Sequence, residues 1–232
     1  MKAIYPRLAL DDIVKNRRIY FPYLVTCICM IAMFYIMRYI GSGECLQYIP
    51  VGKNVIPVFM GLGSFVIAFF ALIFLFYTNS FLARRRAKEF GLLNVLGMSK
   101  KNLVVITFFE TLFTATISLF FGLLIGVALS KFAELGLVKM LDGEVTYRIT
   151  VLPGALLLTA LIFLAIFAVL MVNSVIRVER ATAVNLLKTE AAGEKAPKGN
   201  ILFGLAGLIL LAVAYYIAVT TDKPTDAIGM FF

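Results

Sequence analysis

The chain carries at residues 81–102 the stretch FLARRRAKEFGLLNVLGMSKKN, which lies between two long apolar runs. Six basic residues in this stretch stand against the single acid Glu89. Because lysine and arginine collect on the cytosolic side of membrane proteins, the stretch is predicted to be cytosolic. The apolar runs on either side are then two membrane spans joined by a short cytosolic segment.

Apolar residues within this stretch recur at helical spacing and predict one apolar stripe on a short helix. The members of the stripe are Phe90, Leu92, Leu93, Val95 and Leu96. Gly97 is predicted to be the C′ residue that ends the helix, and Ser99 to be the N-cap of the next helix. Two interpretations are open. Either a soluble partner binds the stripe, or the stripe lies flat among the lipid headgroups and the basic residues only anchor it.

The composition predicts an all-α membrane protein built as a polytopic helical bundle. Hydrophobic residues make up 62% of the chain, charged residues 15%, and the mean hydropathy is +0.96. Soluble domains are closer to half apolar. The chain has three cysteines and no histidine, and it contains neither a phosphate-binding P-loop nor a zinc-protease motif. We therefore expect no cofactor on this chain and no catalytic residues.

Five apolar runs are long enough to cross the hydrocarbon core, which takes about 20 helical residues. Their predicted ranges are 19–40, 55–82, 103–129, 151–176 and 201–220. The second run is longer than a bilayer requires, so it either tilts or extends as a helix below the membrane. The first four runs define a four-span core at residues 19–178, and the fifth run is an additional span.

The segments around the spans complete the predicted domain organisation. Residues 1–18 form a basic amphipathic lead expected along the inner membrane surface, and residues 83–102 form the cytosolic segment that is called the coupling segment below because of the resemblance that follows. The other predicted segments are external loops at 41–54 and 131–150, a cytosolic linker at 179–200 and an external tail at 221–232.

The distribution of positive charge tests this topology. Of the 22 lysines and arginines, sixteen fall in the segments proposed to be inside, and six fall at the outer end of a span or in the segments proposed to be outside. This bias predicts a cytoplasmic N-terminus. The net charge of +9 is then a topology signal with a second use in holding anionic lipid, and nucleic acid is not an expected partner.

Small residues follow one another at intervals of four in the third span. They are Ser118, Gly122, Gly126 and Ser130. Such a stripe lets a neighbouring helix approach closely, so we expect it to be a helix-packing face.

Few polar side chains fall inside the spans, and those that do collect near the inner ends. Glu110 is the only acid clearly within a span, and Asn79 and Asn173 lie near the inner ends of theirs. Because a carboxylate in the membrane is costly, Glu110 is a functional candidate. It either pairs with Lys100, Lys101 or an arginine of residues 84–86, or it belongs to a moving relay.

These residues together resemble the FtsX-like permease domain of ABC transporters. The resemblance is carried by a basic run followed by Lys88-Glu89-Phe90-Gly91-Leu92 and Leu96-Gly97-Met98-Ser99 between the second and third spans. The opening Tyr5-Pro6-Arg7-Leu8-Ala9 and residues 16–23 are similar to the bacitracin-export (BceB-like) branch. The resemblance covers residues 2–188.

The resemblance implies that the coupling segment docks on a separate cytosolic ABC ATPase, expected as a dimer that binds ATP and Mg. The implied coupling residues are Arg84, Arg85, Arg86, Lys88, Glu89, Phe90, Gly91, Leu92, Leu93, Leu96 and Gly97. Leucines 92, 93 and 96 would fill a groove on the ATPase while residues 84–89 set the register at its rim. The second span would carry the motion across the bilayer.

The same resemblance implies a non-catalytic permease subunit in a Gram-positive plasma membrane. Its function would be antimicrobial-peptide export, resistance or sensing, with a membrane sensor histidine kinase as a further partner. Permeases of this branch have ten spans and a large external domain, so this chain looks like an N-terminal half whose partner is the remaining half. The alternatives left open are a non-transporting FtsX-type scaffold that regulates envelope enzymes or a sensor kinase, and a nonfunctional permease fragment.

Overall fold

The computed structural model describes residues 4–42, 55–140, 151–180 and 201–220. All regular structure in these ranges is helical, which confirms the predicted all-α fold class. The chain divides into two compact units, Met1–Glu190 and Ala191–Phe232. Helices α1 to α5 belong to the first unit and α7 to the second.

Four long apolar helices form the body of the first unit. They are α2 at Arg17–Gly41, α3 at Ile56–Val95, α4 at Lys100–Met140 and α5 at Pro153–Arg180. Each contains a segment long and apolar enough to cross a membrane. They match the first four predicted spans, so the prediction of a polytopic helical membrane protein is confirmed.

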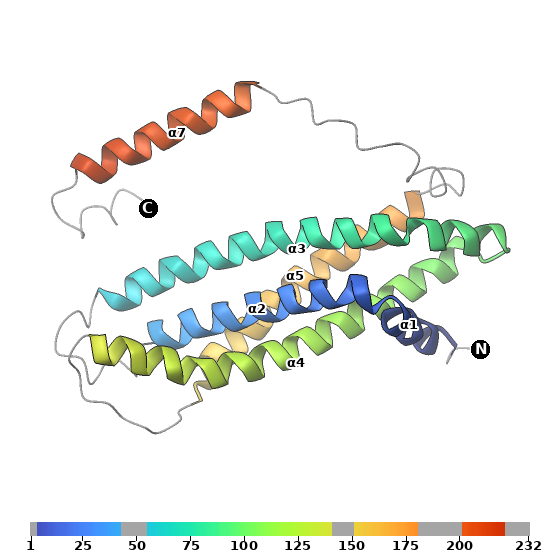
Figure 1. Ribbon diagram of the computed structural model, residues 1–232, viewed down its shortest axis with the longest axis horizontal. Coiled ribbons are helices and arrows are strands. Elements are labelled where there is room, and N and C mark those ends of the chain that lie inside the picture. Colours follow the sequence, from blue (N-terminus) through green and yellow to red (C-terminus); the bar gives the residue numbers. More distant parts are fainter. Residues whose placement is uncertain (1–3, 43–54, 141–150, 181–200, 221–232) are drawn as a thin grey trace. The chain divides into compact units, whose positions relative to one another are not determined.

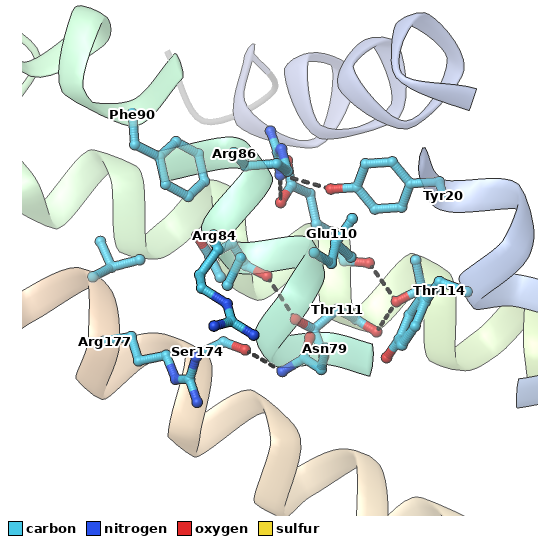
Figure 2. Close-up of a pocket in the computed structure, with 15 residues that line it drawn as sticks. Tyr20, Asn79, Arg84, Arg86, Phe90, Glu110, Thr111, Thr114, Ser174 and Arg177 are labelled. Atoms are coloured by element: carbon cyan, nitrogen blue, oxygen red, sulfur yellow. Dashed lines mark hydrogen bonds and ion pairs between the residues drawn. The ribbon is translucent and has the colours of Figure 1, made fainter. Parts of the chain in front are cut away.

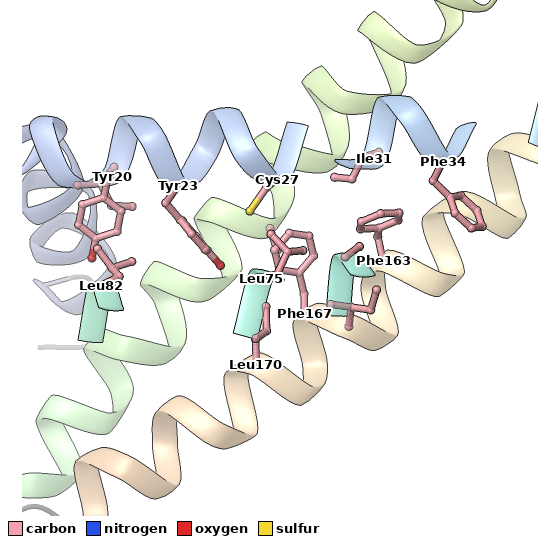
Figure 3. Packing of buried hydrophobic residues seen from close by; sticks show 14 residues of the cluster. Tyr20, Tyr23, Cys27, Ile31, Phe34, Leu75, Leu82, Phe163, Phe167 and Leu170 are labelled. Carbon is pink, nitrogen blue, oxygen red and sulfur yellow. The ribbon is translucent and has the colours of Figure 1, made fainter. Parts of the chain in front are cut away.

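Helix α2 lies between α3 and α4, and α5 packs against all three (Figure 1). Aromatic and aliphatic side chains of α2, α3 and α5 form the main core (Figure 3). Within it the rings of Phe34 and Phe163 meet edge to face, with centroids 5.8 Å apart. Tyr20 and Cys27 of α2 and Leu75 of α3 are also buried there. Because α2 contacts α3, α4 and α5, it is the central helix of the unit.

Helix α3 is one unbroken helix of 40 residues. At 1.5 Å per residue it is about 60 Å long, roughly twice the hydrocarbon thickness. The helix continues through most of the coupling segment, as the extended alternative for the long second span predicts.

Helix α4 is also longer than predicted. It continues to Met140, so residues 131–140, expected in an external loop, are helical. The reason is packing that the sequence pattern did not show. Glu134 is buried, accepts a hydrogen bond from the Tyr39 hydroxyl of α2 at 2.8 Å, and pairs with Lys131 at 3.0 Å.

Helix α1, Ile4–Lys15, forms within the predicted amphipathic lead. It packs on α4 and buries Ala9 and Ile13 within the protein, while Leu10 and Val14 are exposed. The apolar side of the lead therefore covers another helix, where the sequence had suggested only the membrane surface.

The second unit is described over α7, Ile201–Thr220. These 20 residues coincide with the fifth predicted span and would reach about 30 Å, the thickness of the hydrocarbon core. That α7 crosses the membrane stays a prediction. The external loop at 43–54, the end of the second loop at 141–150, most of the linker and the tail lie outside the described residues.

Candidate functional site

The C-terminal end of α3 is closed by a glycine cap. Gly97 has a φ of +96° and its N–H donates to the Asn94 carbonyl at 3.1 Å, while the Met98 N–H donates to the Leu93 carbonyl at 3.0 Å. This pair of bonds is the Schellman motif, which needs a left-handed residue at C′ and so favours glycine. The predicted role of Gly97 is confirmed.

The next helix starts at once. Helix α4 begins at Lys100, directly after Ser99, whose carbonyl accepts hydrogen bonds from the N–H groups of Asn102 and Leu103. Ser99 therefore holds the predicted N-cap position. The turn between α3, which ends at Val95, and α4 is only a few residues long.

Three apolar side chains are exposed at this end of α3. Leu92 is 52% exposed, Val95 66% and Leu96 82%. We call these three residues the apolar tip. An exposed apolar group of this kind at the end of a helix is typical of a binding surface when it lies in water.

Phe90 and Gly91 do not belong to this surface, although the sequence placed both in the coupling set. Both are buried, and Leu93 is partly buried. Residues three apart on a helix are separated by about 300° around its axis. Residues 90, 93 and 96 are therefore each rotated by about 60° from the one before. Phe90 therefore faces the bundle and Leu96 faces outward.

Arg86 is buried as well, so the structure places it inside the bundle, and its role at the rim of a docking surface stays a prediction. It is 3% exposed and projects from α3 into the bundle. Its guanidinium lies 4.8 Å from the centre of the Phe90 ring and 5.6 Å from that of Tyr20. Arg86 and Phe90 are four residues apart and so share the inward face of α3.

The partner of Arg86 within the membrane is Glu110 of α4. Nη1 of Arg86 donates to Glu110 Oε2 and also to the Tyr20 hydroxyl, the latter at 2.7 Å. Glu110 is 5% exposed. Of the two interpretations of Glu110, pairing with an arginine of residues 84–86 is therefore the one that the structure shows.

Asp12 of α1 and Asn16, the N-cap residue of α2, add two polar contacts that sequence reasoning missed. Asp12 Oδ2 pairs with Arg86 Nη2 at 3.1 Å, and the Asn16 amide donates to both carboxylate oxygens of Glu89, at 3.0 and 3.2 Å. Burial raises the pKa of the Asp12 carboxyl, and the neighbouring Arg86 guanidinium opposes this increase. The adjacent acids Asp11 and Asp12 in an otherwise basic lead were the available signal for the contact of Asp12.

Arg86 thus joins side chains from four helices. We call the set Asp12, Asn16, Tyr20, Arg86, Glu89 and Glu110 the inner ionic cluster. Because each charged or polar partner lies on a different part of the chain, displacement of α3 relative to α1, α2 or α4 would break at least one buried contact.

Two further hydrogen bonds join α3 to α5 close by. Asn79 Nδ2 donates to Ser174 Oγ at 2.8 Å, and Arg177 Nη2 donates to Ser80 Oγ at 2.7 Å. Asn173 is half-buried, and its Nδ2 has no partner among the described residues. The predicted polar residue Asn79 therefore ties two helices together, whereas Asn173 does not.

A cavity of about 200 Å³ lies between the inner ends of the four long helices (Figure 2). Its lining residues are Tyr20, Tyr23, Asn79, Leu82, Ala83, Arg84, Arg86, Phe90, Thr107, Glu110, Thr111, Thr114, Ser174, Arg177 and Val178. Among the residues that the structure describes, no cluster of acids and cysteines is arranged to hold a metal ion.

Two other arginines of the coupling segment, Arg84 and Arg85, directly precede Arg86 on α3. Arg84 and Arg85 are exposed, and the Arg85 guanidinium lies 5.1 Å from the centre of the Phe81 ring. Arg84 also lines the cavity. The helix continues through Lys88, whose side chain lies outside the described part of the structure.

The small-residue stripe of α4 is buried, and its two glycines face α2. A methyl group added at Gly122 would lie 2.7 Å from Ile31 Cβ, and one added at Gly126 would lie 3.2 Å from Tyr35 Cβ. Both distances are shorter than ordinary contact, so α2 and α4 approach as closely as they do because position 122 and position 126 have no side chain.

The geometry is that of a polytopic helical membrane protein whose second long apolar helix, α3, continues for 40 residues before the turn to α4. Residues 61–183 match the family described as FtsX-like permease C-terminal. This match covers more than half of the 232 residues. The chain therefore belongs to the FtsX-like permease family, and it is a multi-pass cell-membrane protein.

Similar curated proteins come from Bacillus and a related genus. An uncharacterized ABC transporter permease, YvcS of Bacillus subtilis, is 25% identical over 226 residues, which are 97% of this chain and 34% of that protein. The bacitracin export permease proteins BceB of Bacillus subtilis and Halalkalibacterium halodurans are 26% and 27% identical, each over 91% of this chain and 33% of the relative. The chain thus spans about one third of the length of these relatives.

Proposed function

We propose that this chain is part of the permease subunit of an ABC transporter and that α3 acts as its lever. In this proposal the apolar tip docks on a cytosolic ATPase, and α3 carries the displacement through the bilayer. The observation that carries the proposal is the continuity of α3, a single 40-residue helix that ends in exposed Leu92, Val95 and Leu96.

The inner ionic cluster supports this function because it gives the lever a definite resting position. Arg86 is held by Asp12 and Glu110, and Asn16 holds Glu89 only a few residues from the apolar tip. A push on the tip would act on these contacts first. Since α1 and α4 share the cluster, they would move with α3 rather than independently of it.

The names of two relatives, both bacitracin export permeases, support antimicrobial-peptide export or resistance as the process served. ATP and Mg would bind to the ATPase partner. The rest of a longer permease and a membrane sensor histidine kinase would be further partners in the same membrane. Chemical energy would enter only through the apolar tip.

The test is co-purification of the tagged ATPase with tip variants. Leu92→Asp and Leu96→Asp place a charge on an apolar contact and are expected to reduce recovery of the ATPase by at least tenfold, a cost of about 1.4 kcal/mol. Val14→Asp is the matched control, because Val14 is an exposed apolar residue of α1 outside the tip.

Unchanged recovery of the ATPase with both tip variants would contradict the proposal. Equal loss with Val14→Asp would also contradict it, since the effect would then be independent of the tip. The tip residues are exposed, so these substitutions are expected to leave the folded bundle intact, which its thermal unfolding midpoint would verify.

A further inference from the structure

The inner ionic cluster contains more negative than positive charge. Among the residues that the structure describes, one guanidinium, that of Arg86, contacts three carboxylates. Asp12 Oδ2 lies 3.1 Å from Nη2, Glu110 Oε2 contacts Nη1, and Glu89 Oε2 lies 3.5 Å from Nε. When all three acids are ionised, three negative charges therefore share one positive charge.

Burial makes this imbalance costly for two of the acids. The Glu89 side chain is 44% exposed, so water solvates its charge. The side chains of Asp12 and Glu110 are 24% and 6% exposed, and they share a guanidinium that is itself only 4% exposed. Two carboxylates held at one buried site do not both ionise without a large cost, and such a pair commonly retains a proton. The geometry therefore favours a proton on one of these two acids.

Other ionisable groups surround the cluster. Lys15 of α1 is exposed and acts on Asp12 through its positive charge. Tyr20 of α2 presents a phenol oxygen that accepts a hydrogen bond from the shared guanidinium. Arg84 and Arg177 line the adjoining cavity, and Asp12 is not one of the residues that line it. The positive charges that act on Asp12 are thus those of Lys15 and the shared guanidinium.

The balance of these effects at Asp12 favours the protonated acid. Burial raises the pKa of the Asp12 carboxyl from its ordinary value of 3.8, and the negative charge of Glu89 raises it further. The positive charges of Arg86 and Lys15 lower this pKa, but the net shift is upward. Asp12 is also more exposed than Glu110, so water reaches it more readily to exchange a proton.

We propose that the inner ionic cluster is a proton-binding site and that Asp12 takes up the proton from water. Protonation removes one negative charge from the cluster and gives the Asp12 carboxyl an O–H donor. The cluster offers an acceptor, since Glu110 Oε1 is buried and has no hydrogen-bond partner among the described residues. Helix α1, which carries Asp12, is therefore held against α3 more firmly in the protonated form than in the ionised form. The site is separate from the apolar tip, and its occupancy does not depend on an ATPase.

The direction of the pKa shift fixes the sign of the pH effect. The proton stabilises the fold, because the folded chain binds it more tightly than the unfolded chain does. This stability is fully present below the ordinary pKa of 3.8 and is lost as the pH rises through the higher pKa of Asp12 in the folded state. Asp12→Asn replaces the carboxylate with a neutral amide of similar shape, so it imitates the protonated acid and removes this part of the pH dependence.

The test is reversible unfolding of the full chain in detergent, for the wild type and for Asp12→Asn, at a series of pH values upward from about 4. We expect the ratio of the two unfolding constants, wild type over variant, to rise by up to about tenfold per pH unit until the folded pKa is passed. Asp11→Asn is the matched control, because Asp11 is the exposed neighbour of Asp12 on α1. It is expected to keep the pH dependence of the wild type.

Glu89→Gln is a second variant, compared directly with the wild type. It removes a negative charge that raises the pKa of Asp12 and keeps an oxygen for Asn16, so the transition is expected to move to lower pH. A ratio that does not change with pH would overturn the proposal, and it is the result expected if the arginines of the cavity neutralised the cluster. A ratio that falls as the pH rises would overturn it too, because Arg86 would then hold Asp12 ionised. An unmoved transition in Glu89→Gln, or loss of the pH dependence in Asp11→Asn, would also contradict it.

Discussion

Different interactions hold the two halves of the helical unit together. The outer half contains Gly122 and Gly126 of α4, and the inner half contains the inner ionic cluster. In the outer half, α2 and α4 pack closely because Gly122 and Gly126 have no side chain. The backbone of α4 therefore lies directly against Ile31 and Tyr35 of α2. In the inner half, α1, α2, α3 and α4 are joined through one buried arginine and its carboxylates.

The difference teaches where this protein can move. Helices that pack closely through small residues have no second stable arrangement nearby, because any displacement loses dispersion contacts over the whole helix face. Ion pairs and hydrogen bonds of a single arginine can be exchanged for others or for water at the cytosolic end. We therefore expect the outer half to behave as a fixed joint and the inner half as the part that responds to a partner.

The largest effect on stability is expected from Arg86→Met. It leaves Glu110 buried without its charge partner, and breaking a buried pair in this way costs about 3–5 kcal/mol. The readout is the free energy of unfolding in detergent titrations. Arg85→Met is the control on the exposed side of α3 and is expected to change it by less than about 0.5 kcal/mol.

Replacing both partners sharpens this prediction. Arg86→Met with Glu110→Met removes both charges and is expected to recover most of the lost stability, because apolar residues of similar volume replace a buried pair at little cost. A double variant that is less stable than Arg86→Met alone would mean that Glu110 has a stabilising partner other than Arg86.

The next effect is expected in the outer half from Gly122→Ala. The added methyl group would lie 2.7 Å from Ile31 Cβ and 3.3 Å from the Ile28 carbonyl oxygen, so α2 and α4 must separate. Overpacking of this kind costs about 1–3 kcal/mol. Gly126→Ala, with its nearest contacts at 3.2 Å, is expected to cost less.

Gly136→Ala is the matched control on the same helix, because no atom lies within 4 Å of the added methyl group. Alanine is the better helix former by about 1 kcal/mol, so this variant is expected to be neutral or slightly stabilised. Equal destabilisation by Gly122→Ala and Gly136→Ala would contradict the close-packed joint.

The smallest effect is expected at the contact between α3 and α5. Asn79→Ala removes the hydrogen bond to Ser174, and such bonds between membrane helices contribute about 0.6 kcal/mol on average. A double-mutant cycle with Ser174→Ala isolates this pair. A coupling energy above about 2 kcal/mol would show that the inner half is held as firmly by α5 as by the ionic cluster.

Much of the fold followed from hydropathy and charge. The first four spans, the Gly97 cap and the pairing of Glu110 with an arginine of residues 84–86 are each explained by a local rule. Such rules work here because, in a bilayer, backbone N–H and C=O groups must form their hydrogen bonds within the protein, which favours helices. The small-residue stripe likewise predicted a helix-packing face on α4, although the sequence did not identify the helix that packs against it.

The misses have a common physical cause, which is contact between distant segments. The spacing of residues 90, 93 and 96 suggests one stripe, but which part of it faces inward depends on where α4 lies. The sequence did not pair Asp12 with Arg86 or Asn16 with Glu89, because the members of each pair are more than seventy residues apart. The extension of α4 to Met140 depends in the same way on Tyr39 of α2.

The most direct test of the lever is the accessibility of a single cysteine at the apolar tip. Leu96→Cys, in a chain whose three native cysteines are replaced by alanine, would be treated with a membrane-impermeant maleimide. We expect no labelling in intact cells, rapid labelling in inverted membrane vesicles, and protection when the ATPase is added. Labelling in intact cells, or vesicle labelling that the ATPase leaves unchanged, would contradict a cytosolic tip that docks on a motor.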